Sequence, residues 1–202
     1  MIALYKGISF TSRIIKIRTW SEYSHASWTD DDESIFRAWK EGFEPDSSVI
    51  ESWHIGGVRY NFSINIGHTP GTVIDLFSID LTPSEREGLR EFLLNQVGKK
   101  YDFKGCLNFI TRRKESPAGQ KRWFCSELVF AGFVHIRKPL LLRIPAWKVY
   151  PGLLAYSPLL RKQGTIITQN APGRATFGDL NRDLRALPAG RKCSFCANGG
   201  QS

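Results

Sequence analysis

The sequence predicts an α+β fold, in which helices pack on a mostly antiparallel sheet or partial barrel. Short apolar runs punctuated by Gly and Pro fill residues 2–79, as in a set of strands. Clear helical patterns begin only afterwards, at Thr82. The chain has 202 residues, of which 42% are hydrophobic and 23% charged. That composition fits one globular domain and excludes a disordered chain or a coiled coil.

The first part of the chain combines strands with one short helix. A helix over residues 10–18 is predicted because Phe10 and three isoleucines alternate with basic residues, and Ser9 can cap it. The expected strands are residues 2–5, 23–28, 34–39, 49–53, 58–66 and 72–79.

The later part is helical. Thr82-Pro83-Ser84-Glu85 has a hydroxyl cap, a proline at the first helical position and a glutamate three residues after the cap. Gly98 follows the apolar stripe of that helix and ends it. A second helix is predicted over residues 124–134, and a short helical piece over 107–111. From about residue 163 the periodicity fades, so we expect a domain over 1–163 and a C-terminal extension, either a poorly ordered tail or a loosely packed segment, over 164–202.

The charge distribution is uneven. The net charge is +9, and the basic residues gather in 98–124 and 161–202. Such segments are either solvated loops or a surface for an anionic partner, and no known nucleic-acid-binding module accompanies them. We therefore predict no specific nucleic-acid partner. No apolar run is long enough to span a membrane and no signal peptide begins the chain, so a cytoplasmic location is expected.

Cys125 is the strongest catalytic candidate. It stands at the start of the helix predicted over residues 124–134, where the helix dipole stabilises a thiolate. A cysteine nucleophile also needs a base, and His25, among the small residues Ser24, Ala26 and Ser27, is the natural one. The alternatives are a buried apolar cysteine and a structural histidine.

Glu51 is a candidate third member because it lies inside the apolar strand 49–53. A carboxylate there either needs a partner that it could orient, such as a histidine, or points out of the sheet. His54, His68 and His135 are interpreted as structural. Cys193 and Cys196 form a lone CxxC without the further ligands that a zinc site requires. With no P-loop, dinucleotide fingerprint or HExxH, no cofactor or metal is predicted.

Together these segments resemble the circularly permuted NlpC/P60 group of papain-like cysteine hydrolases, in its YiiX/YaeF-like branch. The resemblance is carried by four motifs in order: Ser24-His25, the strand 49–53 with Gly56-Gly57, Tyr101-Asp102-Phe103-Lys104-Gly105, and Trp123-Phe124-Cys125-Ser126-Glu127-Leu128-Val129. It extends from about Met1 to Leu160.

The resemblance implies a papain-like fold and acyl transfer through Cys125 as nucleophile, His25 as base and Glu51 as the polar third residue. The implied substrate is a peptide, a peptidoglycan-like molecule or another acyl compound, with an amide bond cleaved through an acyl-enzyme. Two alternatives stay open. One is a lipid, ester or thioester acyl hydrolase or acyltransferase at a membrane surface, because the helix 10–18 could contact anionic lipid. The other is a non-catalytic basic binding module.

Overall fold

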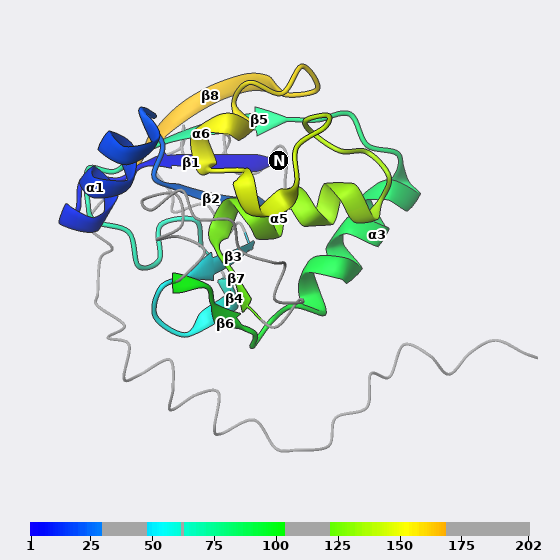
Figure 1. Ribbon diagram of the computed structural model, residues 1–202, viewed down its shortest axis with the longest axis horizontal. Helices are drawn as coiled ribbons and strands as arrows, with labels where there is room; N and C mark the ends of the chain where they lie inside the picture. The colour runs from blue at the N-terminus through cyan, green and yellow to red at the C-terminus, as the bar shows by residue number, and fades with distance from the viewer. Residues whose placement is uncertain (30–47, 62, 104–121, 169–202) are drawn as a thin grey trace, which may run out of the picture. The chain divides into compact units, whose positions relative to one another are not determined.

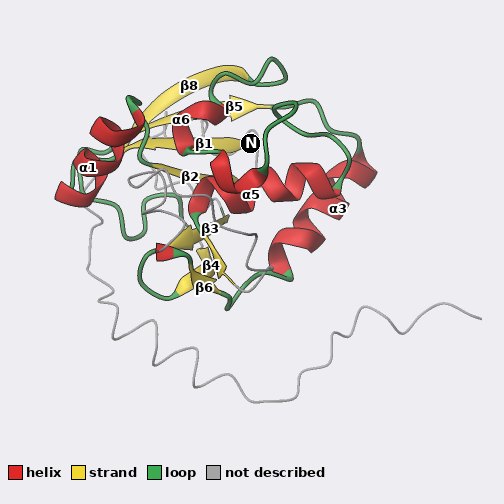
Figure 2. Cartoon of the chain, viewed as in Figure 1, coloured by secondary structure: helices red, strands yellow, loops and turns green. Residues whose placement is uncertain are grey.

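A six-stranded sheet organises the computed structural model (Figures 1 and 2), which describes residues 1–29, 48–61, 63–103 and 122–168. The strand order is β4-β3-β2-β1-β5-β8, and all neighbours are antiparallel. The strands are β1 (Ile2–Lys6), β2 (His25–Thr29), β3 (Val49–Trp53), β4 (Gly57–Asn61), β5 (Val73–Ser78) and β8 (Arg161–Ile167). Two short strands, β6 (Lys100–Tyr101) and β7 (Arg122–Trp123), form a separate parallel pair. The α+β class with a mostly antiparallel sheet is therefore confirmed, and the sheet is open rather than a closed barrel.

The helices follow the local signals in the sequence. They are α1 (Phe10–Thr19), α3 (Pro83–Leu94), α5 (Cys125–His135), α6 (Pro151–Leu154) and the 3-10 helix η1 (Ala146–Lys148). At the start of α3 the Thr82 hydroxyl accepts the Glu85 N–H, and the Glu85 carboxylate accepts the Thr82 N–H at 2.8 Å. This is the predicted capping box. Within the described ranges, none of these helices has the length and apolarity needed to cross a bilayer.

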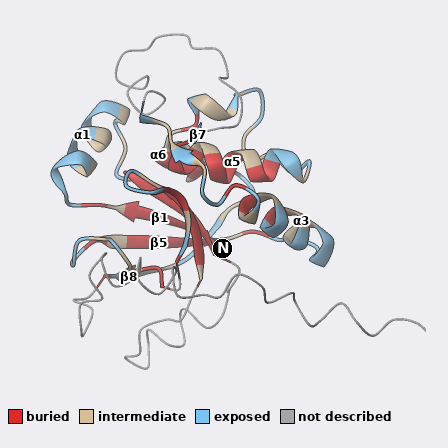
Figure 3. Ribbon diagram, turned by 90° about the horizontal axis from the view of Figure 1, so that it is seen from below, coloured by how far each residue is buried: buried red, intermediate tan, exposed pale blue. Residues whose placement is uncertain are grey.

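Each face of the sheet carries its own apolar cluster. Helices α3 and α5 cover one face (Figure 3), where Leu89 and Leu93 of α3 and Phe133 of α5 join the core with strand residues such as Trp28 and Ile50. The opposite face carries a second apolar cluster: Met1, Ala3, Tyr5, Val49, Ile64, Ile74, Leu76 and Ile166. Because side chains alternate along a strand, each strand contributes to both faces.

Helix α5 approaches α3 closely at Gly132. A Cβ atom at this position would lie 2.6 Å from Leu89 Cδ1, which is closer than packed carbon atoms tolerate. The glycine therefore lets the two helices share one apolar layer above the sheet.

Some expected boundaries differ from the observed ones. Strand β4 ends at Asn61, and the stretch up to Ile66 that was expected to continue it turns at residues 64–67. Helix α3 ends at Leu94, before the glycine expected to close it. Strand β8 was not expected, and it crosses the boundary anticipated at residue 163. The strand expected at 34–39, the helical piece at 107–111 and the tail beyond residue 168 lie outside the described residues.

Candidate active site

His25 and Glu51 are hydrogen-bonded partners on adjacent strands. His25 begins β2, and Glu51 of β3 is in register with Ser27 of β2. The imidazole Nε2 lies 2.5 Å from the Glu51 Oε2. The imidazole packs edge-on against the rings of Tyr5 and Trp53, with ring centroids 5.0 Å apart in each case. These aromatic rings fix the orientation of the imidazole and exclude water from one side of it.

Glu51 is fully buried and its second oxygen is also occupied. Its Oε1 accepts from Arg59 Nε at 2.9 Å, from Arg59 Nη2 at 2.6 Å and from Asn61 Nδ2 at 2.6 Å. Both donors come from β4, where Arg59 is the register partner of Glu51. The Arg59 guanidinium also lies over the Trp53 ring, at 4.6 Å. A charged, multiply bonded partner is what a buried carboxylate requires.

These contacts set the protonation of the pair. Burial alone would raise the pKa of Glu51, but hydrogen bonds and charges from His25 and His68 hold that pKa well below 4.5. Burial lowers the pKa of His25 below 6.5, against the opposing effect of its bond to Glu51. At neutral pH the carboxylate is thus ionised and the imidazole neutral. An ionised carboxylate only accepts, so the imidazole donates from Nε2 and its lone pair lies on Nδ1.

His68 is a third polar neighbour, from the loop between β4 and β5. Its ring stacks on Tyr5 with centroids 4.1 Å apart, and its Nε2 lies 3.7 Å from Glu51 Oε2. One donor atom each from His25, Glu51 and His68 falls within 4.8 Å of the others, so these three residues are the described group that could hold a metal ion. The sequence offered no sign of this, because a histidine in a turn gives no information about its long-range contacts.

Cys125 begins α5 and is 4% exposed. The segment leading into it is tied to the end of the sheet near His25. Ser52 Oγ donates to the Trp123 carbonyl at 2.6 Å, and Tyr101 of β6 is the register partner of Trp123. Helix α5 itself packs on β2 and β3. The start of α5 is therefore fixed relative to the strands that carry His25 and Glu51.

The His25 side chain and helix α5 lie on different faces of the sheet. Ala26, beside His25, belongs to the core that α5 covers, whereas His25 contacts Tyr5, which belongs to the opposite apolar cluster. His25 is the first residue of its strand, so it stands at the end of the sheet, where both faces can be reached.

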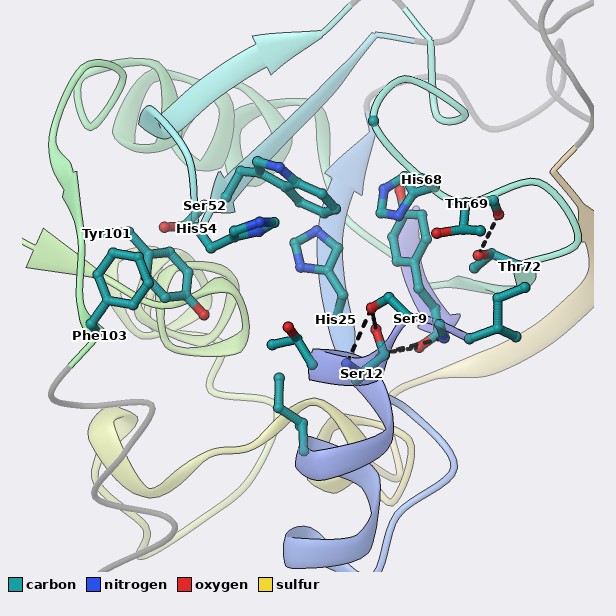
Figure 4. A pocket seen from close by; sticks show the side chains of 18 residues that line it. Ser9, Ser12, His25, Ser52, His54, His68, Thr69, Thr72, Tyr101 and Phe103 are labelled. Atoms are coloured by element: carbon teal, nitrogen blue, oxygen red, sulfur yellow. Dashed lines mark hydrogen bonds between the residues drawn. The ribbon is translucent and has the colours of Figure 1, made fainter.

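A pocket of about 280 Å³ opens at this end of the sheet (Figure 4). His25 stands in it between His54 and His68, and residues of α1, including Ser12, close one side. Ser52 and Tyr101, which contact the segment before α5, also line it; Cys125 is not among the described lining residues. Among the described lining residues none is Asp, Glu, Lys or Arg.

Glu127 lies two residues after Cys125 in the first turn of α5. Its carboxylate accepts weakly from the Phe124 N–H at 3.5 Å. Burial raises its pKa to about 7, and the nearby charge of Asp102 acts in the same direction. Near neutral pH this carboxyl therefore titrates within two residues of the candidate nucleophile.

Of the three predicted site residues, His25 and Glu51 are directly hydrogen-bonded to each other. The segment before the third, Cys125, is hydrogen-bonded to β3 through Ser52. Arg59 and Asn61 were missed by sequence reasoning, although a signal existed. A tight turn near Gly56-Gly57 between strands 49–53 and 58–66 brings Glu51 opposite Arg59. An opposite-charge cross-strand pair follows from that register.

Comparisons with known proteins identify the fold. No family model and no curated protein matches the sequence. Among solved structures, the chain is similar to the crystal structure of the metalloprotein yiiX from Escherichia coli O157:H7 (DUF1105). The TM-score is 0.54 at 16% sequence identity, and the match covers 82% of this chain and 95% of that one. The chain therefore has a yiiX-like α+β fold, in agreement with the branch that the sequence motifs resemble.

Proposed function

We propose that this protein is a cysteine hydrolase of the circularly permuted NlpC/P60 type that cleaves an amide bond through Cys125, His25 and Glu51. The observation that carries the proposal is the hydrogen bond of 2.5 Å between His25 Nε2 and the buried Glu51 carboxylate. A neutral imidazole that donates from Nε2 to an ionised carboxylate has its lone pair on Nδ1. That is the state a general base needs before it accepts a thiol proton.

In the proposed reaction His25 Nδ1 takes the proton of the Cys125 thiol, and the thiolate attacks the substrate carbonyl carbon. The oxyanion that forms is stabilised by N–H groups of the first turn of α5. The C–N bond then breaks, and His25 returns the proton to the leaving amine. In the second half His25 takes a proton from water, the hydroxide attacks the thioester, and the carboxylic acid leaves as Cys125 regains its proton.

Glu51 acts in this scheme as a positioning residue. Its bond to Nε2 fixes the tautomer and stabilises the imidazolium that forms in each half-reaction. Arg59 and Asn61 hold Glu51 in turn through its other oxygen. The described lining residues are aromatic, aliphatic and small polar side chains together with three histidines, which suits the acyl portion of a peptide or a peptidoglycan-like molecule.

The structurally similar yiiX is a metalloprotein, and the same residues offer possible metal ligands here. Two imidazoles and a carboxylate are suitable zinc ligands. With metal–ligand bonds of about 2.0–2.1 Å, two ligand atoms of a tetrahedral zinc lie roughly 3.3 Å apart. The 2.5 Å between His25 Nε2 and Glu51 Oε2 is a hydrogen-bond distance and is too short for two ligands of one ion. In this structure His25 and Glu51 are therefore a hydrogen-bonded pair rather than two ligands of one ion.

The test is the pH dependence of thiol alkylation by iodoacetamide, with each modified cysteine mapped by mass spectrometry. Cys125 is expected to react with a midpoint below about 8.5, the ordinary thiol value. The midpoint should rise in His25→Ala and in His25→Gln, of which the second keeps a hydrogen-bond donor for Glu51. His54→Ala is the matched control, because His54 also lines the pocket, whereas the hydrogen bond to Glu51 is made by His25 Nε2.

Because Cys125 is buried, the midpoint rather than the absolute rate is the readout. Equal midpoints for Cys125 in the wild type and both folded His25 variants would contradict the proposed pair. A shift of the same size in His54→Ala would show a general effect of the pocket and also count against it.

A further inference from the structure

Helix α1 exposes a row of large apolar side chains. No residue of α1 is buried. Phe10 is 79% exposed, Ile14 41% and Ile17 75%, and Trp20, directly after the helix, is 96% exposed. Residues at positions i, i+4 and i+7 share one face of a helix, so Phe10, Ile14 and Ile17 form a continuous stripe. Large side chains gathered in this way mark a surface that meets something apolar.

Basic residues flank this stripe. Arg13 and Arg18 lie on its two sides at helical spacing, and Lys16 lies further round toward the polar face. The segment from Ile8 to Ser21 contains no acidic residue. An apolar stripe bordered by lysine and arginine is the pattern of a helix that lies in the plane of a membrane surface.

The other face of α1 belongs to the candidate site. Thr11, Ser12 and Ile15 line the pocket that holds His25 (Figure 4), and Figure 3 shows α1 at the margin of the described fold with its outer face exposed. The Ser9 side chain caps the helix by accepting the Ser12 N–H at 3.2 Å. The helix is thus anchored and capped, and its stripe can meet a surface without any change in the pocket wall.

We propose that α1 docks the protein onto an anionic lipid bilayer. Phe10, Ile14, Ile17 and Trp20 enter the boundary between head groups and acyl chains, while Arg13 and Lys16 contact acidic head groups. Charge complementarity selects this occupant, because a second copy of the chain would bring an equally positive face against this one. The docking stands independently of the Cys125 chemistry, and it would bring one wall of the His25 pocket to the bilayer surface.

The test is co-sedimentation of the full chain with vesicles of phosphatidylcholine, alone or mixed with phosphatidylserine. We expect binding to the mixed vesicles only. Binding should be lost at high salt, because the Debye length falls from about 30 Å at 0.01 M to about 3 Å at 1 M. Arg13→Gln with Lys16→Gln should weaken binding by roughly 30-fold, about fivefold for each charge removed. Phe10→Ser with Ile17→Ser should weaken it by about tenfold or more.

Matched controls remove similar side chains elsewhere. Leu142→Ser removes an apolar side chain that is 79% exposed, and Lys100→Gln removes an exposed basic one from β6. Both should bind like the wild type. The proposal is overturned if the protein ignores both vesicle types, if the Phe10/Ile17 variant binds as well as the wild type, or if the controls lose as much affinity. A wild type that sediments as a dimer and becomes monomeric in the Phe10/Ile17 variant would assign the stripe to a second copy and also overturn it.

Discussion

At the scale of single residues, the molecule depends on how one buried charge is balanced. Glu51 is 0% exposed, and it bonds to His25, Arg59 and Asn61. Removing one partner from such a group leaves another polar group buried without compensation, which costs more than the intact arrangement contributes. The stability of the sheet and the orientation of His25 therefore rest on the same carboxylate.

Glu51→Gln should lower the free energy of unfolding by about 3 kcal/mol, because Arg59 then faces a neutral amide in a buried site. Urea denaturation at pH 7 measures this. The control is Glu22→Gln, which removes an ion pair with Lys6 at the surface, where the Glu22 side chain is 73% exposed. That change should cost less than about 1 kcal/mol. Similar losses in the two variants would show that the buried charge has no special role.

The same residue shows how far sequence reasoning reaches. A carboxylate inside the apolar strand 49–53 predicts either a partner or an outward side chain, and the strand alone cannot choose between them. The choice depends on Arg59, which a hairpin register supplies, and on His25, which comes from a strand far away in sequence. His68 joins the cluster from a loop with no periodic pattern, so only the folded chain reveals it.

At the scale of elements, opposing effects act on the pKa of Glu127 at the start of α5. The N-terminal dipole of a helix favours an ionised Glu127, but burial raises the pKa of this residue to about 7. Burial therefore outweighs the hydrogen bond from the Phe124 N–H, which lowers this pKa. The helix start was predicted within one residue because its signals are local, whereas the burial of Glu127 depends on the segments that pack around it.

This imbalance makes stability depend on pH. A carboxyl whose pKa is raised from 4.5 to about 7 by folding stabilises the protein below pH 4.5, and the contribution disappears as the pH rises through 7. Relative to Glu127→Gln, the wild type should thus lose up to about 3 kcal/mol between these limits. Urea unfolding of both proteins across this pH range measures the difference.

Glu85→Gln is the control of opposite sign. The Thr82 N–H bonds to Glu85 at the start of α3 and lowers the pKa of Glu85, so its contribution is present above pH 4.5 and lost as the pH falls further. A difference between wild type and Glu127→Gln that stays flat or rises with pH would contradict the assignment.

At the scale of the whole molecule, the sequence predicts the α+β fold class better than it predicts the order of strands in the sheet. Alternating apolar runs and a capping box are local, so they indicate strands followed by helices. The order β4-β3-β2-β1-β5-β8 requires the late strand β8 to return beside β5. Few features of the sequence indicate this pairing. Of the residues Arg161–Ile167 only Ile166 is buried, as is usual for an edge strand that begins with basic residues.

Strand β8 nevertheless completes a buried ionic network. Asp75 of β5 is 1% exposed, and it bonds to Lys162 Nζ at 2.8 Å and to Thr165 Oγ1 at 2.5 Å. Hydrogen bonds from these and neighbouring groups lower the pKa of Asp75 despite its burial. The edge strand therefore supplies partners that the centre of the sheet needs.

Two truncated chains test whether the folded domain includes β8 or ends at residue 163. A chain ending at 169 keeps all described partners of Asp75, together with the Thr72–Thr168 backbone bond at 2.9 Å. It should unfold cooperatively with the stability of the full chain. A chain ending at 163 uncovers the apolar surface that Ile166 packs against and removes the Thr165 hydroxyl from Asp75, so it should lose about 3 kcal/mol or more. Equal urea midpoints for the two truncated chains would mean that β8 only borders the sheet and does not stabilise it.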